Sequence, residues 1–161
     1  MLSFVPMANY WLMKSEPFVY SIEDLERDGA TCWDGVRNYQ ARNFMRDRMK
    51  LGDHVLYYHS NAKPAGVAGL ARVIKEAYPD HTSWDANGDY FDPKSSPESP
   101  RWFMVDIAFE EKFQQLVTLD RIKAESTFQE MVLLKRSRLS IQPVKAKEFS
   151  LIAKIGRSQV S

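Results

Sequence analysis

Apolar and polar positions alternate along the chain with the period of strands in some segments and of helices in others. Apolar runs at 10–13, 54–59 (HVLYYH) and 66–74 (GVAGLARVI) predict three strands. The second and third runs are apolar on both faces, as expected of strands inside a closed or covered sheet. Strict alternation over 102–109 predicts a fourth strand, and 140–144 predicts a short extended segment.

Helical signals fill the interval between the first two strands. Ser21 and Asp24 have the spacing of a capping box, which predicts a short helix over 22–27 that ends at Gly29. Asn38 is placed to cap a second helix. The predicted inward face of this helix has apolar residues at helical spacing: Ala41, Phe44, Met45 and Met49.

The segment 80–100 breaks the pattern with turn-forming residues, three prolines and several aromatic residues. A structureless segment of about this length inside a compact domain is unusual and is often functional. After the fourth strand, helices are predicted over 118–125, 127–134 and 147–155, with Gly156 ending the last. The order of elements predicts an α+β fold with a small, strongly curved sheet.

Composition limits the classes of protein to consider. A chain of 161 residues with 44% hydrophobic residues predicts one globular domain with a sizeable core. The 22 Lys and Arg residues nearly balance 21 Asp and Glu residues, so contact with nucleic acid has to come from a local basic patch. A lone cysteine, Cys32, excludes an internal disulfide. With no bilayer-length apolar run and no signal peptide in MLSFVPM, the sequence predicts a soluble intracellular protein without a membrane partner.

Sequence motifs argue against common catalytic and metal chemistry. His54 and His59 lie five residues apart on one predicted strand, so they point to opposite faces and cannot share a zinc ion. No G-x-S-x-G elbow, dinucleotide fingerprint or phosphate-binding P-loop is present. Glu110 and Glu111 also diverge on a strand, which disfavours paired acid–base work. The sequence therefore predicts no metal site, no cofactor and no catalytic constellation.

Basic residues gather in two segments. Arg42, Arg46 and Lys50 form a stripe at i, i+4 and i+8 on the helix that follows Asn38, with Tyr39 beside it. The helix N-terminal amides add partial positive charge that suits a phosphate. A second cluster is free of acidic residues and comprises Lys135, Arg136, Arg138, Lys145 and Lys147. Each group alone is compatible with a solvated surface, and together they favour phosphate contact.

Aromatic residues in or beside turns indicate the class of ligand. These residues are Trp33, Trp84, Tyr90 and Trp102. Single-stranded or extruded bases are held by stacking, about 1–3 kcal/mol per base, and by hydrogen bonds to the base edge. Polar residues that could read the edge are Ser15, Asn38, Ser60 and Asn61. For each tryptophan taken singly, packing in the core is the alternative interpretation.

Seven segments together resemble the EVE domain family over residues 9–156: YWLMKSEP (10–17), WDGVRNYQARNFMR (33–46), GDHVLYYHSN (52–61), GVAGLARV (66–73), YFDPKS (90–95), PRWFMVD (100–106) and LKRSRLSIQPV (134–144). The resemblance implies a PUA-like fold, a small, strongly curved mixed sheet that approaches a barrel and is surrounded by helices. Residues 1–8 would then be an N-terminal extension and 157–161 a C-terminal tail.

The family is similar to YTH domains, which read N6-methyladenine in RNA. The resemblance also implies that the chain could read modified cytosines in DNA. A YTH pocket holds an extruded base between tryptophans. By the same resemblance Trp33 matches the first of these tryptophans, and Trp84 falls in the region of the second, for which Tyr90 and Trp102 are alternatives. Ser15, Asn38 and the Ser60–Asn61 pair fall at the implied rim.

The sequence therefore predicts a non-enzymatic binder of a modified nucleobase in DNA or RNA. The predicted nucleobase contacts are Trp33, Trp84, Ser15, Asn38, Tyr39, Ser60, Asn61 and Trp102. The predicted phosphate contacts are Arg37, Arg42 and Arg46. Two alternatives remain: an RNA- or nucleotide-processing enzyme that uses the same pocket, and a small-molecule-binding module.

Overall fold

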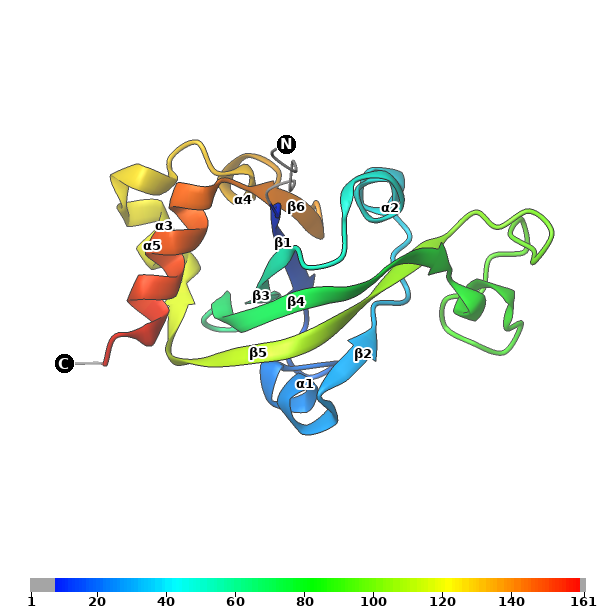
Figure 1. Cartoon of the computed structure of the whole chain (residues 1–161), viewed down its shortest axis with the longest axis horizontal. Coiled ribbons are helices and arrows are strands. Elements are labelled where there is room, and N and C mark those ends of the chain that lie inside the picture. Colours follow the sequence, from blue (N-terminus) through cyan, green and yellow to red (C-terminus); the bar gives the residue numbers. More distant parts are fainter. Residues whose placement is uncertain (1–7, 160–161) are drawn as a thin grey trace, which may run out of the picture.

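The computed structural model describes residues 8–159, which form a mixed sheet with helices around it (Figure 1). The strand order is β2-β5-β4-β3-β1-β6. Strands β1 and β3 are parallel, and every other neighbouring pair is antiparallel. The sheet curves but does not close, with β2 and β6 at its edges, so the predicted α+β fold with a strongly curved mixed sheet is confirmed. Of the predicted terminal segments, 1–7 and 160–161 lie outside the described residues.

The strands extend further than the hydrophobic pattern predicts. Their bounds are β1 (Tyr10–Ser15), β2 (Ala30–Cys32), β3 (His54–His59), β4 (Gly66–Pro79), β5 (Phe103–Thr118) and β6 (Ile141–Val144). The β3 bounds agree with the prediction, whereas 66–74 and 102–109 were too short. The reason lies in the β4–β5 ladder, whose register shifts four times and so interrupts strict alternation. The three-residue β2 was missed because it is too short to show a period.

The N-terminal helices follow their predicted capping. In α1 (Ile22–Asp28), Ser21 and Asp24 form the expected capping box, and Gly29 ends the helix with a φ of 79°. In α2 (Tyr39–Asn43), the Asn38 side chain accepts a hydrogen bond from the Ala41 N–H. The helix then continues as a π-helical turn over Phe44–Arg48.

The C-terminal helices depart from the prediction in two places. The helix predicted at 118–125 is α3 (Leu119–Ala124), but the helix predicted at 127–134 is wrong: a 3-10 turn (Ser126–Phe128) and α4 (Val132–Lys135) replace it. Met131 between them has extended backbone, which separates the two turns. The last helix, α5 (Ala146–Arg157), does not end at Gly156, whose missing side chain makes room for the Phe113 ring: a Cβ there would lie 2.2 Å from Cδ2.

Side chains from the two faces of the sheet pack into two cores. Along β3, Val55 and Tyr57 belong to one core and Leu56 and Tyr58 to the other. The first core includes α1, α2 and the segment that follows β2, and the second includes α3 to α5. In Figure 1, α3, α4 and α5 gather at one end of the sheet, and the 80–102 segment extends from the opposite end. Both faces are therefore covered, as the apolar strands indicated.

Candidate functional site

A pocket of about 490 Å³ lies where three strands deliver polar and aromatic residues to one place. Because β1 and β3 are parallel neighbours, their carboxyl ends lie side by side at the same end of the sheet. There the Ser60 N–H donates to the Ser15 carbonyl at 3.0 Å. Strand β2 contributes Thr31 and Cys32 to the lining and leads into 33–37, which also line the pocket. The lining comprises Lys14, Ser15, Glu16, Val19, Tyr20, Thr31, Cys32, Trp33, Asp34, Gly35, Val36, Arg37, Ser60, Tyr90 and Ser140.

Trp33 forms a buried wall of this pocket. Only 9% of the residue is exposed, and its indole packs edge-on against the Tyr57 ring, with centroids 5.5 Å apart. Its backbone N–H donates to the Val105 carbonyl at 2.8 Å, which continues the pairing of β2 with β5. Trp33 thus belongs to the core and lines the pocket at once, so the two interpretations of its sequence position both apply.

Tyr90 lines the pocket from the 80–102 segment and is 39% exposed. Its ring covers Gly35, where an added Cβ would lie 2.7 Å from Cζ, and Gly35 also has a φ of 79°. Gly35 therefore serves both the turn after Trp33 and the close approach of Tyr90. These contacts bring a residue 57 positions away in sequence to the same pocket as Trp33.

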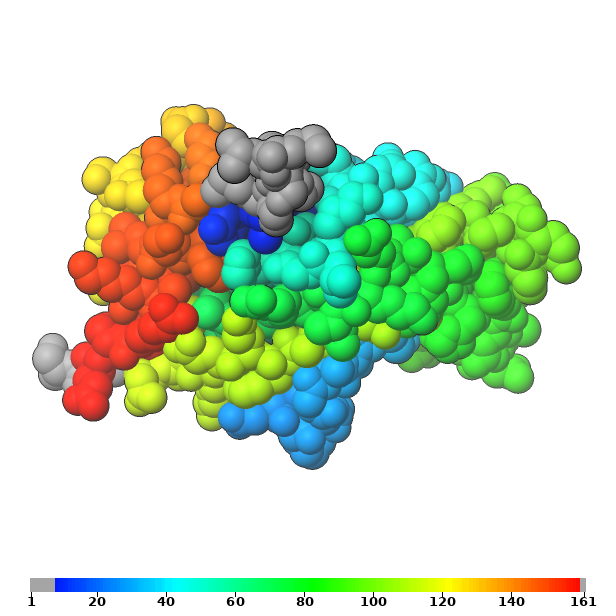
Figure 2. Space-filling model, viewed as in Figure 1, coloured from blue at the N-terminus to red at the C-terminus, as the bar shows by residue number. Residues whose placement is uncertain are grey.

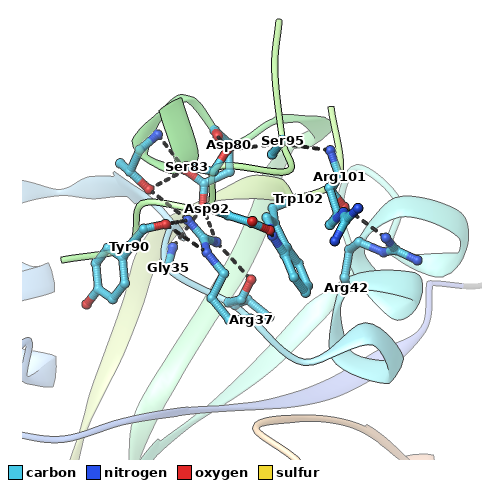
Figure 3. A network of polar contacts seen from close by, with 12 residues as sticks. Gly35, Arg37, Arg42, Asp80, Ser83, Tyr90, Asp92, Ser95, Arg101 and Trp102 are labelled. Atoms are coloured by element: carbon cyan, nitrogen blue, oxygen red, sulfur yellow. Dashed lines mark hydrogen bonds and ion pairs between the residues drawn. The ribbon is translucent and has the colours of Figure 1, made fainter. Parts of the chain in front are cut away.

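Arg37 holds the Tyr90 backbone in place (Figure 3). Its Nε and Nη2 donate to the Tyr90 carbonyl at 3.0 and 2.7 Å. Nη1 donates to the Val36 carbonyl and to Asp80 Oδ2, and Nη2 also donates to Thr82 Oγ1. All five N–H groups of the guanidinium therefore have acceptors within the molecule. In this arrangement Arg37 acts on the pocket through Tyr90 and has no N–H left for a phosphate.

Asp80 is the buried partner of this arginine. Its carboxylate accepts from Arg37, from the Gly35 N–H at 2.8 Å, and from both the N–H and the hydroxyl of Thr82. Burial alone would raise the pKa of Asp80, but these hydrogen bonds outweigh it and hold the pKa below its usual range. An ionised Asp80 thus joins the segment after β2 to the start of the 80–102 segment.

The rest of the 80–102 segment has its own polar network. Trp102 Nε1 donates to Asp92 at 2.6 Å, Ser83 Oγ donates to Ser95 Oγ at 3.2 Å, and the Arg101 N–H donates to Ser95 Oγ at 3.0 Å. The hydrogen bond from Trp102 holds the pKa of Asp92 below its usual range. Figure 2 shows this segment as a separate lobe at one end of the molecule. Its turn-forming residues therefore make an ordered lobe, which we call the 80–102 lobe.

The structure brings together some of the sequence-predicted site residues. Ser15, Trp33, Arg37 and Ser60 line the pocket, as does Tyr90, the alternative to Trp84. Seven others lie outside the lining: Asn38, Tyr39, Asn61, Trp84, Trp102, Arg42 and Arg46. Asn38 caps α2, and Asn61 Nδ2 donates to Glu16 Oε2 at 3.2 Å. Trp84 lies in a 3-10 turn (His81–Trp84) of the lobe, with its indole N–H buried and unpartnered among the described residues.

Trp102 and Tyr39 form a second aromatic group beside the pocket. Their rings stack with centroids 4.9 Å apart and an interplanar angle of 25°. Arg42 lies over Tyr39 at 4.7 Å, and Arg37 lies over Trp102 at 5.4 Å on the side that faces Tyr90 (Figure 3). The stacked pair of rings therefore lies between two arginines and stabilises the junction between α2 and the lobe.

Three basic residues near this junction have partners within the chain. Arg42 donates to the Arg101 carbonyl at 2.9 Å, and Arg46 pairs with the neighbouring Asp47. Arg136, from the second basic cluster, donates to Gln40 Oε1 at 2.6 Å. This contact joins residues 96 positions apart and brings the second basic cluster to α2.

Several pocket residues escaped the sequence prediction. Asp34 directly follows Trp33 in the segment 33–46, so its position next to a predicted pocket residue could have identified it. Lys14 adjoins Ser15 in the same way, and its Nζ donates to the Ser137 carbonyl at 2.6 Å. Ser140 lies far from the other pocket residues in sequence, and only the pairing of β6 with β1 brings it near them.

Within residues 8–159, His, Cys, Asp and Glu side chains form no group of three or more that could hold a metal ion. No helix in the same range has the length and apolar character that crossing a membrane requires.

Comparison with known proteins identifies relatives along nearly the whole chain. The human thymocyte nuclear protein 1 is 42% identical over 96% of this chain and 77% of its own. A hypothetical protein from Leishmania major superimposes with a TM-score of 0.90 and 47% identity, covering 93% of this chain and 95% of that one. The human THYN1 protein, solved in complex with 5-methylcytosine-containing DNA, gives a TM-score of 0.89 at 42% identity, covering 95% of this chain and all of that one.

A more distant structure bears on the fold alone. The YTH domain of Zygosaccharomyces rouxii MRB1, in complex with N6-methyladenosine RNA, has a TM-score of 0.57 at 12% identity, covering this whole chain and 92% of that one. Its similarity agrees with the predicted relation between the two folds. The EVE domain model itself matches residues 9–155. With this match and these relatives, the chain belongs to the EVE domain family.

Proposed function

We propose that this protein binds a modified nucleobase in nucleic acid, without catalysis, in the pocket between Trp33 and Tyr90. The observation that supports it most is the convergence of two aromatic residues, from the β2 end and from the 80–102 lobe, on one cavity with hydroxyl groups on its wall. Cavities of this size suit a small planar ligand. In this proposal Trp33 and Tyr90 contact the faces of the base, and Ser15 and Ser60 contact its edge.

Similarity to the THYN1 complex favours DNA and 5-methylcytosine as the ligand class. A methyl group that enters an apolar part of the pocket contributes about 0.8 kcal/mol, roughly a fourfold preference over unmodified cytosine. Val19, Val36 and Tyr20 provide apolar lining for such a group.

Contacts with flanking phosphates come from basic residues outside the pocket. Arg42 and Arg46 keep their predicted role in this proposal, and the second basic cluster, which contacts α2 through Arg136 and Gln40, supplies further candidates. The roles of Asn38, Tyr39 and Trp102 in this proposal are structural: they cap α2 and hold the junction with the lobe. We also propose that the EVE domain of this chain comprises residues 9–156.

Calorimetric titration of short oligonucleotides with one 5-methylcytosine tests the proposal. We expect tighter binding of the methylated oligonucleotide than of its unmodified match, and weaker binding of both as salt increases, because released counterions drive phosphate contact. Equal affinities for the two would contradict base reading. Affinity that ignores salt would favour a small-molecule module, and product from a nucleic-acid substrate at stoichiometric protein would favour an enzyme.

A further inference from the structure

Most charged groups of the pocket already have partners. Lys14 Nζ donates to the Ser137 carbonyl, Glu16 Oε2 accepts from Asn61, and every N–H of Arg37 is engaged. The exception is Asp34, whose carboxylate neither accepts from nor pairs with another side chain in residues 8–159. Asp34 is therefore the pocket carboxylate whose acceptor sites are all left for a ligand, whereas Glu16 already uses one for Asn61.

The surroundings of Asp34 increase its demand for a donor. Burial raises the pKa of this carboxyl, and the negative charge of Asp80 raises it further, while its own backbone N–H, His81 and Arg37 oppose the shift less strongly. A phosphate at this side of the pocket would meet two carboxylates and be repelled. Asp34 is exposed in the free protein, and a ligand that fills the pocket and presents an N–H to its carboxylate would replace the water that the carboxylate loses.

The donor pattern of the pyrimidines makes this position informative. Cytosine has an exocyclic amino group at position 4, which donates, whereas thymine has a carbonyl there, which accepts. Thymine and 5-methylcytosine have the same methyl group at position 5. An apolar slot for the methyl therefore cannot separate the two bases, and the separation has to come from an acceptor that faces position 4.

We propose that Asp34 is the specificity-determining residue that accepts a hydrogen bond from the exocyclic amino group, so that the pocket takes 5-methylcytosine and rejects thymine. This inference rests on the proposed function. With thymine in the pocket, the carboxylate would face the O4 carbonyl, two acceptors without a proton between them. Pairing of a side chain with the correct base edge discriminates by roughly tenfold or more.

The test is Asp34→Asn, measured by titration with three oligonucleotides that differ only in one base: 5-methylcytosine, cytosine and thymine. An amide both donates and accepts, so it can serve either base. We expect the unmodified protein to prefer 5-methylcytosine over thymine by about tenfold or more. In the variant the ratio should fall to within about threefold, mainly through a gain in thymine binding.

Glu16→Gln is the matched control, because it removes the other pocket carboxylate, which already has Asn61 as a partner. We expect the control to keep the same preference for 5-methylcytosine over thymine as the parent protein. Both variants should unfold at the same midpoint as the parent protein. If Asp34→Asn kept the same affinity ratio of 5-methylcytosine to thymine, this inference would be overturned. Equal affinity of the parent protein for these two bases would overturn it as well. Failure of the proposed function is distinguishable, since it appears as equal affinity of the unmodified protein for 5-methylcytosine and cytosine.

Discussion

Trp33 and Tyr90 line the same pocket, yet different interactions hold them. Trp33 is in the core, with its indole against Tyr57 and its backbone paired with β5. Tyr90 is in the 80–102 lobe, where its carbonyl accepts two hydrogen bonds from Arg37, which in turn is held by Asp80. Packing thus fixes one wall, and a charged hydrogen-bond network fixes the other.

This difference separates stability from binding. A change at Trp33 alters the free energy of unfolding and the affinity together, because the same side chain serves the core and the pocket. Tyr90 is 39% exposed, against 9% for Trp33, so a change there should alter affinity with a smaller effect on unfolding. Changes to the hydrogen-bond network between Arg37 and Asp80 should have effects on unfolding free energy that lie between those of the changes at Trp33 and at Tyr90.

Trp33→Ala should have the largest effect. Removing a buried indole costs about 3–5 kcal/mol of unfolding free energy, and the variant also loses one stacking surface. Chemical denaturation and oligonucleotide titration measure the two losses separately. Trp33→Phe, which retains a ring, should fold and keep part of the affinity. If that variant lost stability but bound methylated oligonucleotides as tightly as the unmodified protein, Trp33 would be a core residue alone.

Asp80→Asn should have the next largest effect. The variant removes the charge that Arg37 and Thr82 contact, at a cost of roughly 1.5–3 kcal/mol of unfolding free energy. Affinity should fall as well, because Arg37 no longer fixes the Tyr90 carbonyl. Asp89→Asn, an exposed change in the same lobe, is the control and should alter neither quantity. Unchanged affinity in Asp80→Asn would mean that the network does not position Tyr90.

Tyr90→Ala should weaken binding by about 1–3 kcal/mol, the contribution of one stacked base. The unfolding free energy should change by less than about 0.5 kcal/mol, since the side chain is substantially exposed. Phe91→Ala removes an equally exposed ring that is not part of the pocket, and it should bind normally. Loss of stability in Tyr90→Ala without loss of affinity would reverse the contrast between the walls.

Mild acid should have the smallest effect on stability, and it should affect α1 at a higher pH than the 80–102 lobe. His59 Nε2 accepts from the Ile22 N–H at the start of α1, and burial lowers the pKa of His59. Because the unfolded state binds a proton at a higher pH, near 6.5, than the folded state does, stability declines as pH falls below that value, by at most about 1.4 kcal/mol per pH unit. His59→Gln should abolish this decline.

Asp80 makes stability depend on pH in the same direction as His59, but at lower pH. Its lowered pKa stabilises the folded protein above the unfolded value, near 3.9, and that contribution is lost only as pH falls from there through the folded pKa. Hydrogen-exchange protection factors at pH 6 should therefore be lower in α1 than they are at neutral pH, with the protection factors of the lobe unchanged. Earlier loosening of the lobe would contradict this order.

The sequence predicted the scaffold better than the pocket. Capping at Ser21 and Asn38 depends on residues three positions apart, and the apolar strands encode their own burial, so local pattern sufficed for them. The junction of Trp33, Tyr90 and Ser140 depends on strand order and on the lobe, which periodicity does not specify. Arg37 illustrates the limit: the sequence placed it among the phosphate contacts, whereas its partners Asp80 and the Tyr90 carbonyl lie in a distant segment.

A double-mutant cycle between the two walls tests the central claim most directly. Trp33→Leu, Tyr90→Leu and the double variant would be titrated with one methylated oligonucleotide, at a temperature where all three remain folded. If one base lies between both rings, the two losses should be non-additive by at least about 0.5 kcal/mol. Losses that add to within about 0.3 kcal/mol would mean that the walls act independently, and would contradict a shared base.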